Sequence, residues 1–306
     1  MTEKRVSIII PAYNEAASIG GLIGTIKTMY PNFEVIIVDD ASSDNTAEIA
    51  KTTGAKVLSH PYNIGNGAAV KTGMRVASGD FFVTMDGDGQ HRPEDIGKLL
   101  EEIETYDMVV GERKFSGQAS FGRYIGNLFY NKFASYVTKF KVKDLTSGFR
   151  AVNAGMAKKF LYLFPNTYSY PTTLTLSVLR SGRSVKYLPV SSNKRRKGKS
   201  GIHLLKDGVR FFMIIIKICT LFSPLRIFLP VSSSLFMMGI LHYILTYFKS
   251  GRFTNMSALL LVTGVVVFMM GLVSEQICQM RFERTGDFRL QDNIKQQKDK
   301  TADKIF

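Results

Sequence analysis

Short apolar runs alternate with longer amphipathic stretches through the first third of the chain. Runs of this length are typical of buried strands, and the stretches between them carry apolar residues at helical spacing. Strands that alternate with helices predict a largely parallel sheet covered by helices. We expect strands at 6–10, 35–38, 56–59, 81–85 and 108–111, and helices at 17–29, 45–53, 66–77 and 93–105, the last with Pro93 in its first position.

Two longer apolar runs follow, at 227–248 and 256–274. Each is close to the roughly 20 apolar residues that cross a bilayer, and both are nearly free of charge. A buried helix of a soluble protein is the alternative. Because only residues 249–255 separate the runs, we expect a tight transmembrane hairpin.

The segment before the first apolar run has polar residues every three to four positions on an otherwise apolar background. This pattern predicts an amphipathic helix in the membrane interface, with packing into the soluble core as the alternative. We therefore divide the chain into an α/β domain over 1–200, an interfacial helix over 201–224, a two-helix hairpin over 225–280 and a polar tail over 281–306.

The formal net charge is +15, which raises the question of a polyanionic partner. The basic residues gather on either side of the hairpin, where each can gain about 1 kcal/mol from anionic lipids, so we expect a membrane surface and no nucleic acid. The chain begins without a secretory signal, and the excess of Lys and Arg outside the hairpin loop predicts a multi-pass protein whose N-terminal domain and tail are cytoplasmic. These residues are Lys194, Arg195, Arg196, Lys197, Lys199, Lys206, Arg210, Lys217, Arg281, Arg284 and Arg289, against Lys249 and Arg252 in the loop.

Acidic and polar residues follow three of the expected strands. Asp86 and Asp88, one glycine apart, come directly after the strand at 81–85, and segments 11–15 and 39–44 follow two others. The carboxyl ends of parallel strands open on one edge of a sheet, where open α/β folds bind ligands. Two carboxylates there can hold a divalent cation, and the cation can bind a diphosphate. The pattern therefore indicates nucleotide-sugar chemistry.

Seven segments together resemble the GT-A glycosyltransferases of family 2, and within them the polyisoprenyl-phosphate glycosyltransferases of the dolichyl-phosphate mannose synthase type. The resemblance implies an α/β, Rossmann-like GT-A domain with a mostly parallel sheet. The segments occur in order over the first two-thirds of the chain: PAYNE (11–15), VDDASSDNT (38–46), NIGNGAAVKTGM (63–74), DGDGQHRPED (86–95), GERK (111–114), DLTSGFRA (144–151) and RRKGKS (195–200).

The resemblance implies a metal and donor site. Asp86, Asp88 and Gln90 would bind Mg²⁺ or Mn²⁺, as hard oxygen ligands do; a solvated acidic turn is the alternative. Asp40 is the candidate for the nucleobase, and a carboxylate accepts equally from uracil and from guanine, so UDP and GDP both remain open. The resemblance also places Pro11, Tyr13 and Glu15 at the base and ribose; the alternatives are ordinary packing for Tyr13 and a helix N-terminal acid for Glu15. Lys71 would lie near phosphate, with a plain helix start as the alternative.

The acceptor side is expected to carry cations instead of a general base. A lipid phosphate has a second pKa of about 6 and is already ionised at neutral pH, but two anions must be brought together. The resemblance assigns the acceptor phosphate to Arg113 and Arg123, with Lys114 as the fallback. Arg195 and Ser200 fit a mobile basic loop that could close over the diphosphate; a juxtamembrane charge cluster is the alternative. Segment 146–150 and Asp144 would shape the sugar and acceptor pocket.

We therefore expect an inverting, metal-dependent enzyme that moves one sugar from UDP-glucose, UDP-N-acetylglucosamine or GDP-mannose to a polyisoprenyl phosphate. A polysaccharide synthase of this fold uses a Gln-x-x-Arg-Trp motif, and the chain contains no tryptophan. Transfer to a non-phosphate acceptor and a non-catalytic sugar-nucleotide sensor are the remaining alternatives. A homo-oligomer is also possible through Gly239, Gly264 and Gly271, because small residues let membrane helices approach closely.

Overall fold

The structure is a computed structural model that describes residues 5–113, 121–166, 169–191 and 220–302. The chain divides into two compact units, residues 1–207 and 208–306. The predicted interfacial helix at 201–224 falls almost entirely outside the described residues, as do Lys114, Arg195 and Ser200.

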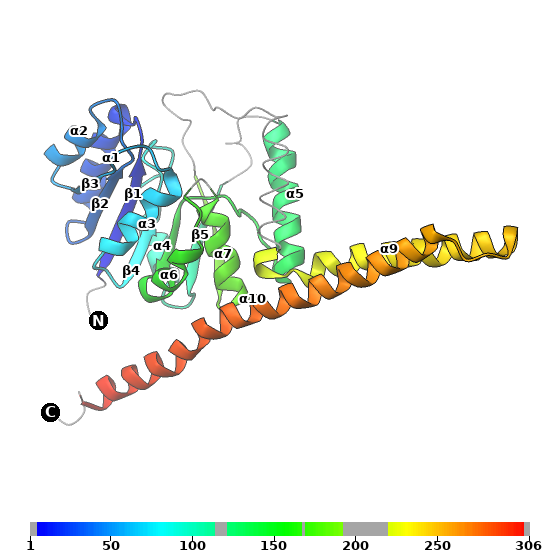
Figure 1. Ribbon diagram of the computed structural model, residues 1–306. Helices are drawn as coiled ribbons and strands as arrows, with labels where there is room; N and C mark the ends of the chain where they lie inside the picture. The colour runs from blue at the N-terminus through cyan, green and yellow to red at the C-terminus, as the bar shows by residue number, and fades with distance from the viewer. Residues whose placement is uncertain (1–4, 114–120, 167–168, 192–219, 303–306) are drawn as a thin grey trace. The chain divides into compact units, whose positions relative to one another are not determined.

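The first unit is built on a seven-stranded sheet with the order β3-β2-β1-β4-β6-β5-β7 (Figure 1). Within the described sheet, β6 runs antiparallel to both of its neighbours, and all other pairs are parallel. The predicted, mostly parallel α/β fold is therefore confirmed. The strands are β1 (Val6–Ala12), β2 (Glu34–Asp39), β3 (Lys56–Ser59), β4 (Phe81–Thr84), β5 (Met108–Arg113), β6 (Arg150–Asn153) and β7 (Val185–Val190).

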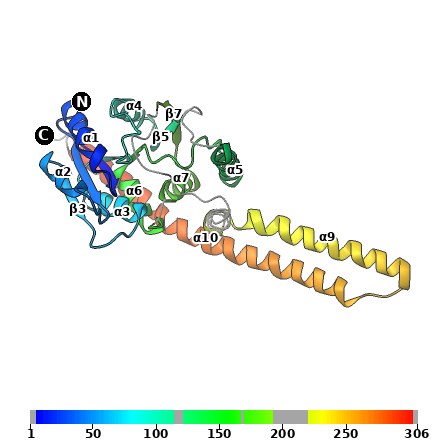
Figure 2. The ribbon, with the colours of Figure 1, turned by 90° about the horizontal axis from the view of Figure 1, so that it is seen from above.

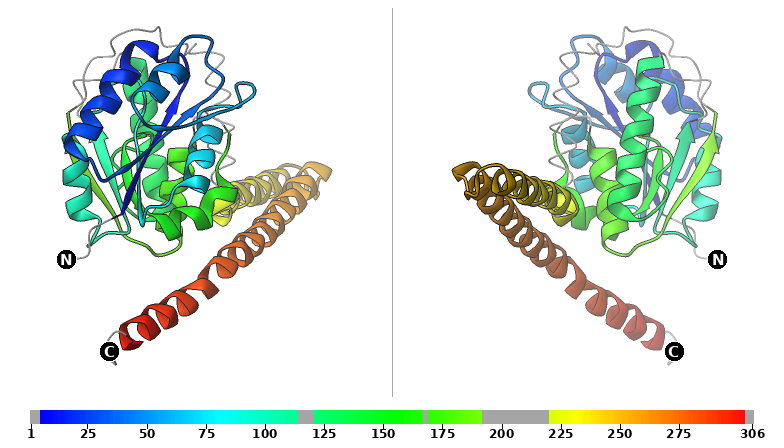
Figure 3. Two further views of the ribbon diagram at one scale, coloured as in Figure 1. Left: turned by 90° about the vertical axis from the view of Figure 1, so that its left-hand side faces the viewer. Right: turned by 90° about the vertical axis from the view of Figure 1, so that its right-hand side faces the viewer.

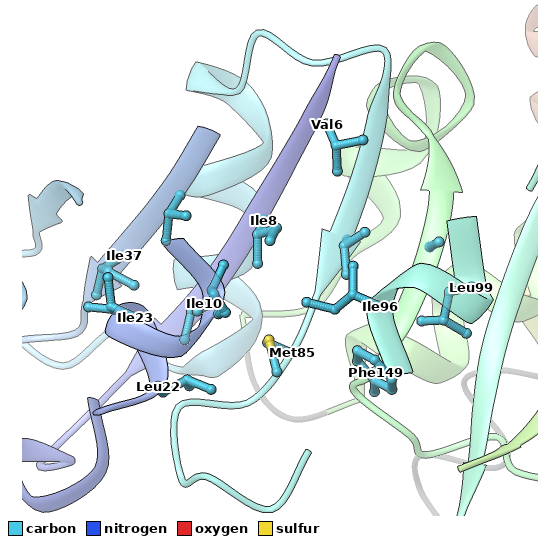
Figure 4. Close-up of a cluster of buried hydrophobic side chains, with 14 of the residues drawn as sticks. Val6, Ile8, Ile10, Leu22, Ile23, Ile37, Met85, Ile96, Leu99 and Phe149 are labelled. Carbon is cyan, nitrogen blue, oxygen red and sulfur yellow. The ribbon is translucent and has the colours of Figure 1, made fainter. Parts of the chain in front are cut away.

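Helices cover both faces of the sheet (Figure 3). Successive side chains of a strand point to opposite faces, and apolar side chains on both faces are buried under helices. Ile8 and Ile10 of β1 pack in a fully buried cluster with side chains of α1 and α4, which Figure 4 shows. Ile9 faces α3 on the other side, where a Cβ on Gly73 would come within 2.5 Å of the Ile9 side chain. The helices are α1 (Ala16–Met29), α2 (Thr46–Thr52), α3 (Asn66–Val76), α4 (Asp95–Glu102), α5 (Phe121–Thr138), α6 (Ala154–Phe160) and α7 (Tyr170–Arg180), with a 3₁₀ turn η2 (Leu161–Leu163).

The predicted strands and helices agree with these bounds to within a few residues, with one correction. Pro93 was expected at the first position of its helix, but α4 begins at Asp95, with Glu94 as its N-cap residue. The Pro93 carbonyl instead accepts a hydrogen bond of 3.0 Å from the backbone N–H of Ile96. The proline therefore belongs to the turn that leads into the helix.

The second unit contains an antiparallel helix pair, α9 (Leu225–Ser250) and α10 (Asn255–Ala302), which run side by side in Figure 2. Leu225–Ser250 and Asn255–Met280 each contain an 18-residue stretch, with mean hydropathies of 1.6 and 2.5, and are long and apolar enough to cross a membrane. Gly251 ends α9 in the left-handed region, with φ 63°, which favours glycine. The predicted spans lie within these two segments, and the predicted polar tail begins as a continuation of α10.

The three hairpin glycines lie against the neighbouring helix of the hairpin, and an association between copies of the chain through them stays a prediction. A Cβ on Gly264 would lie 3.2 Å from the Phe236 backbone N and from the Ser232 carbonyl oxygen. Gly271 lies in the same way against Phe228, and Gly239 against Leu261. These glycines therefore allow α9 and α10 to pack closely on each other.

Candidate active site

The site lies where the order of the strands reverses. From β1 the chain continues to β2 and β3 on one side, and then crosses to β4 on the other side of β1. Ligands of open α/β sheets bind in the crevice outside the carboxyl ends of the strands at such a point. The loops that begin at Tyr13, Asp40 and Met85 leave three neighbouring strands at this edge.

Hydrogen bonds hold the loops after β1 and β2 together. Asn14, at φ 56°, donates its backbone N–H to Ser42 Oγ at 2.9 Å and accepts at Oδ1 from the backbone N–H of Ser43 at 2.8 Å. The backbone N–H of Glu15 donates to Thr46 Oγ1 at 2.9 Å. A positive φ is uncommon for residues other than glycine, and asparagine is among the residues that adopt it most often. The edge of the site next to β1 and β2 is therefore fixed by its own side chains.

Three predicted donor contacts belong to β1 and the loop after it. Pro11 is buried within β1, whereas Tyr13 is 49% exposed beyond its end. Glu15 is the N-cap residue of α1, but it makes no side-chain capping bond there. Its carboxylate instead accepts from Ser18 Oγ at 3.3 Å. Their proposed contacts with base and ribose stay predictions.

Asp40 is buried and accepts hydrogen bonds from three donors. His60 Nδ1 is 2.7 Å from Oδ1, and the backbone N–H groups of Ile64 and Gly65 donate to Oδ1 at 3.0 Å and to Oδ2 at 2.7 Å. Asp40 thereby joins the loop after β2 to the segment that leads into α3. His60 was not predicted as a site residue, although it directly follows β3 at the same edge of the sheet.

Lys71 contacts the segment after η2. Its Nζ donates to the Phe164 carbonyl oxygen at 3.2 Å and to Asn166 Oδ1 at 2.5 Å. Burial, and secondarily the charge of Arg75, lowers the pKa of Lys71. A phosphate contact for this residue stays a prediction, and it would compete with these two hydrogen bonds.

Asp86 follows β4 and is enclosed on one side by the turn before β6. A Cβ on Gly148 would lie 2.8 Å from both carboxylate oxygens. On another side, His91 Nε2 is 3.4 Å from Asp86 Oδ2, and its ring stacks on Phe149 with the centroids 5.0 Å apart. The Asp86 side chain nevertheless keeps 38% of its surface exposed.

The surroundings of Asp86 favour its ionised form. Burial alone raises the pKa of Asp86, but the hydrogen bond from His91 and the positive charges of Arg113 and Arg150 outweigh burial, so the pKa lies below its usual range. A partly exposed carboxylate that stays charged is able to bind a cation.

Asp88 and Gln90 share the tight turn that follows. The backbone N–H of Gln90 donates to Asp88 Oδ1 at 3.1 Å, and Gly89 between them has φ 71°. No cluster of three or more His, Cys, Asp or Glu side chains that could hold a metal occurs in the described part of the chain. Two carboxylates and one amide oxygen still fit Mg²⁺ or Mn²⁺, because such ions commonly take one or two protein carboxylates and fill their coordination with water and substrate phosphate.

Arg113, at the end of β5, is held in place by Asp144 and Thr146. Its Nε and Nη2 donate to the two oxygens of Asp144 at 2.9 and 3.0 Å, and Nη2 also donates to Thr146 Oγ1 at 2.7 Å. Burial alone lowers the pKa of Arg113. The hydrogen bond and charge of Asp144, together with the charges of Asp86 and Asp88, outweigh burial, so the pKa lies above its usual value. The structure therefore brings Arg113 near Asp86 and Asp88. Asp144, which was predicted to shape the sugar and acceptor pocket, is the hydrogen-bonding partner of Arg113.

Arg150 is a buried cation that sequence reasoning noted only as part of a motif. It is 0% exposed and donates to the carbonyl oxygens of Ser147 and Pro171 and to Thr175 Oγ1, the last at 3.0 Å. Burial lowers its pKa, while its charge helps to keep Asp86 ionised. Arg123 lies in the first turn of α5, and its side chain falls outside the part of the structure that is described.

Comparisons with family models match both units of the chain. The model for glycosyl transferase family 2 matches residues 7–161, and the model for the GtrB C-terminal hairpin matches residues 223–280.

Curated relatives match at similar identity. The undecaprenyl-phosphate mannosyltransferase of Micrococcus luteus is 30% identical over 214 residues, which cover 64% of this chain and 86% of the relative. The undecaprenyl-phosphate 4-deoxy-4-formamido-L-arabinose transferase of Aeromonas hydrophila subsp. hydrophila is 30% identical over 301 residues, which cover 90% of this chain and 89% of the relative.

Solved structures share the fold. Glucosyl-3-phosphoglycerate synthase from Mycobacterium tuberculosis, in complex with Mn²⁺ and UDP-glucose, superposes with a TM-score of 0.57 at 21% identity and covers 71% of this chain and 78% of that chain. The same enzyme in complex with Mg²⁺ and UDP gives a TM-score of 0.56 at 20% identity, with coverages of 71% and 78%.

Proposed function

Because the chain belongs to glycosyl transferase family 2, we propose that it transfers one sugar from a nucleoside diphosphate sugar to a polyprenyl phosphate. The observation that carries this proposal is the partly exposed carboxylate of Asp86 at the switch point of the sheet, with Arg113 nearby. Relatives named for undecaprenyl-phosphate as their acceptor support the choice of lipid.

On the donor side, Asp86, Asp88 and Gln90 would hold Mg²⁺ or Mn²⁺. A divalent cation bound there would neutralise charge on the departing nucleoside diphosphate. The rest of the donor is held by the protein. Asp40 would bind the base, next to Tyr13, and the three loops at the sheet edge would surround the ribose. UDP-glucose, UDP-N-acetylglucosamine and GDP-mannose are the donors to test.

On the acceptor side, Arg113 would bind the lipid phosphate and align it with the anomeric carbon. Asp144 and Thr146 fix the guanidinium group, so little conformational freedom is lost when the phosphate binds. The bond from C1 to the diphosphate oxygen breaks while a bond from C1 to a phosphate oxygen of the lipid forms, with inversion at C1. No proton is transferred, because the lipid phosphate is already ionised. We assign Arg123, Lys114, Arg195 and Ser200 to the same anionic groups.

The hairpin supports a reaction at a membrane surface. The segments Leu225–Ser250 and Asn255–Met280 are apolar enough to span a bilayer, and a polyprenyl phosphate is itself a membrane lipid. The excess of basic residues on the outer ends of the hairpin favours the cytoplasmic side and contacts with anionic lipids.

The test uses membranes that contain the full chain, undecaprenyl phosphate and one radiolabelled donor at a time. We expect a single labelled sugar to be recovered in organic solvent as an acid-labile lipid product, and D88A membranes to give none. Label in a long polymer would support a polysaccharide synthase, and label on an acceptor without phosphate would support the second alternative. Nucleotide binding without transfer to any acceptor would support a sensor.

A further inference from the structure

The ring of His60 joins Asp40 to Thr72 in α3. Its Nδ1 is 2.7 Å from Asp40 Oδ1 and its Nε2 is 3.0 Å from Thr72 Oγ1 in α3. The side chains of His60 and Asp40 are only 9% and 4% exposed. The backbone N–H of His60 also donates to the Asp39 carbonyl oxygen at 2.9 Å, so both the backbone and the ring of this residue are held.

The contacts of Asp40 leave one of its oxygens partly available. Each carboxylate oxygen has two acceptor positions. Oδ1 receives the His60 ring and the backbone N–H of Ile64, while Oδ2 receives the backbone N–H of Gly65. Within the described residues, Oδ2 therefore keeps one acceptor position for a ligand.

Because Asp40 is buried, the chemistry of that last position is selective. A ligand that offers an N–H completes the hydrogen bonds of the carboxylate, whereas a ring nitrogen with a lone pair meets a second acceptor and leaves both unpaired. Buried polar groups left unpaired in this way weaken binding by about 5- to 150-fold. Uracil N3 and guanine N1 are ring nitrogens that carry such an N–H, whereas the ring nitrogen N3 of cytosine is an acceptor.

We propose that His60 is a positioning residue for base selection, which holds Asp40 so that Oδ2 accepts from an N–H of the donor nucleobase. This inference rests on the proposed function, because it assumes that Asp40 faces the nucleobase. The ring is suited to the task because its two nitrogens reach partners on different elements. Asp40 lies after β2 and Thr72 lies in α3, so rotation of the carboxylate would require movement of a buried ring.

The test compares two amides that imitate different ring nitrogens. In H60N the amide nitrogen takes the place of Nδ1 and can still donate to Asp40, whereas in H60Q it takes the place of Nε2 and reaches toward Thr72. Affinities of UDP, GDP and CDP would be measured by calorimetry on the full chain in detergent with Mn²⁺. Ser59, an exposed neighbour on β3, provides the control variant S59A.

We expect H60Q to bind the preferred nucleotide, UDP or GDP, about 10- to 100-fold more weakly than the wild type, since a hydrogen bond to a charged group is lost. H60N should remain within about threefold, and the affinity for CDP should change less than threefold in both variants. The discrimination against CDP therefore falls in H60Q alone. S59A should match the wild type for all three nucleotides.

Two results would overturn the inference. Equal weakening of all three nucleotides in H60Q would show that His60 only supports the fold, and wild-type affinities in H60Q would show that it does not position Asp40. The proposed function is judged separately by sugar transfer. A wild-type chain that binds UDP or GDP but glycosylates no lipid would refute the proposed transferase activity. The role of His60 would still be decided by the ratios of the nucleotide affinities in H60Q and H60N.

Discussion

Gly148 lies directly against the carboxylate of Asp86. A Cβ at position 148 would come within 2.8 Å of both carboxylate oxygens, closer than such atoms pack in proteins. Gly148 belongs to the turn before β6, whereas Asp86 follows β4, so the antiparallel pairing of these two strands creates the contact. The absence of a side chain at 148 thus leaves the space that the Asp86 carboxylate occupies.

We expect G148A to displace Asp86 and to lower the rate of sugar transfer by about 100-fold or more, since misplacement of a reacting group by 1 Å can cost that much. Calorimetric titration with Mn²⁺ in the presence of nucleotide would show the loss of metal-dependent binding. G24A serves as the control, because a Cβ there meets nothing within 4 Å. Full activity of G148A would show that Asp86 tolerates the shift.

The metal role of Asp88 predicts that D88N loses metal-dependent nucleotide binding while its melting temperature stays close to that of the wild type. The amide keeps the shape of the side chain but not its charge, and divalent cations prefer carboxylate oxygens. Chelation of the wild type should stop transfer, and added Mn²⁺ should restore it. Transfer by D88N at the wild-type rate would place the cation elsewhere.

Replacement of Arg113 tests the acceptor side. We expect R113K to raise the KM for the lipid phosphate by about 10- to 100-fold, because lysine cannot keep the forked contact with Asp144 and a phosphate at once. The KM for the donor should change much less. Initial rates measured against lipid concentration in mixed micelles would separate the two. An equal rise in both KM values would assign Arg113 to the donor diphosphate.

Asp107 provides a pH test of stability away from the site. Burial raises its pKa, but hydrogen bonds from the Ser184 backbone N–H and Oγ, both 2.8 Å, and the charge of Arg183 lower it below the usual range. This carboxylate therefore stabilises the fold fully above its unfolded pKa of about 3.9, and the contribution is lost as the pH falls through the lower folded value.

We accordingly expect D107N to melt about 2–4 °C below the wild type at pH 7, which corresponds to about 1 kcal/mol for a partly exposed group. The difference should shrink below about pH 4 as the wild-type carboxylate takes up its proton. Thermal melts in detergent at a series of pH values would measure it. A difference that stays constant down to pH 2 would mean that packing, and not charge, is lost.

The hairpin glycines predict the effect of a bulky residue between α9 and α10. We expect G264L to separate the helices and make the loop at 251–254 more sensitive to protease, because the Cβ alone would lie 3.2 Å from backbone atoms of α9. V266L is the control, since Val266 is 51% exposed. If G264L instead changed only the oligomeric state, the glycine would be acting between copies of the chain.

The sequence predicts β1 to β5 well, but not the parallel edge strand β7, because β1 to β5 are short, mostly apolar runs that end in polar loops. The carboxylates at those ends could therefore be placed at one edge. It does not predict β6, because four residues that pair antiparallel between two distant strands leave no periodic signal. The partners of Asp40 and Arg113 were missed for a related reason: His60 and Asp144 reach them through the tertiary fold, 20 and 31 residues away along the chain.

The reversed direction of β6 brings two separate stretches of the chain together at one edge of the sheet. One side of the candidate site comes from residues 11–91 and the other from residues 108–150, and each is held largely by its own hydrogen bonds. A substitution on the second side would therefore leave the hydrogen bonds of the first side intact. Asp86 and Gly148, where the two sides touch, form the contact through which a change on one side would reach the other.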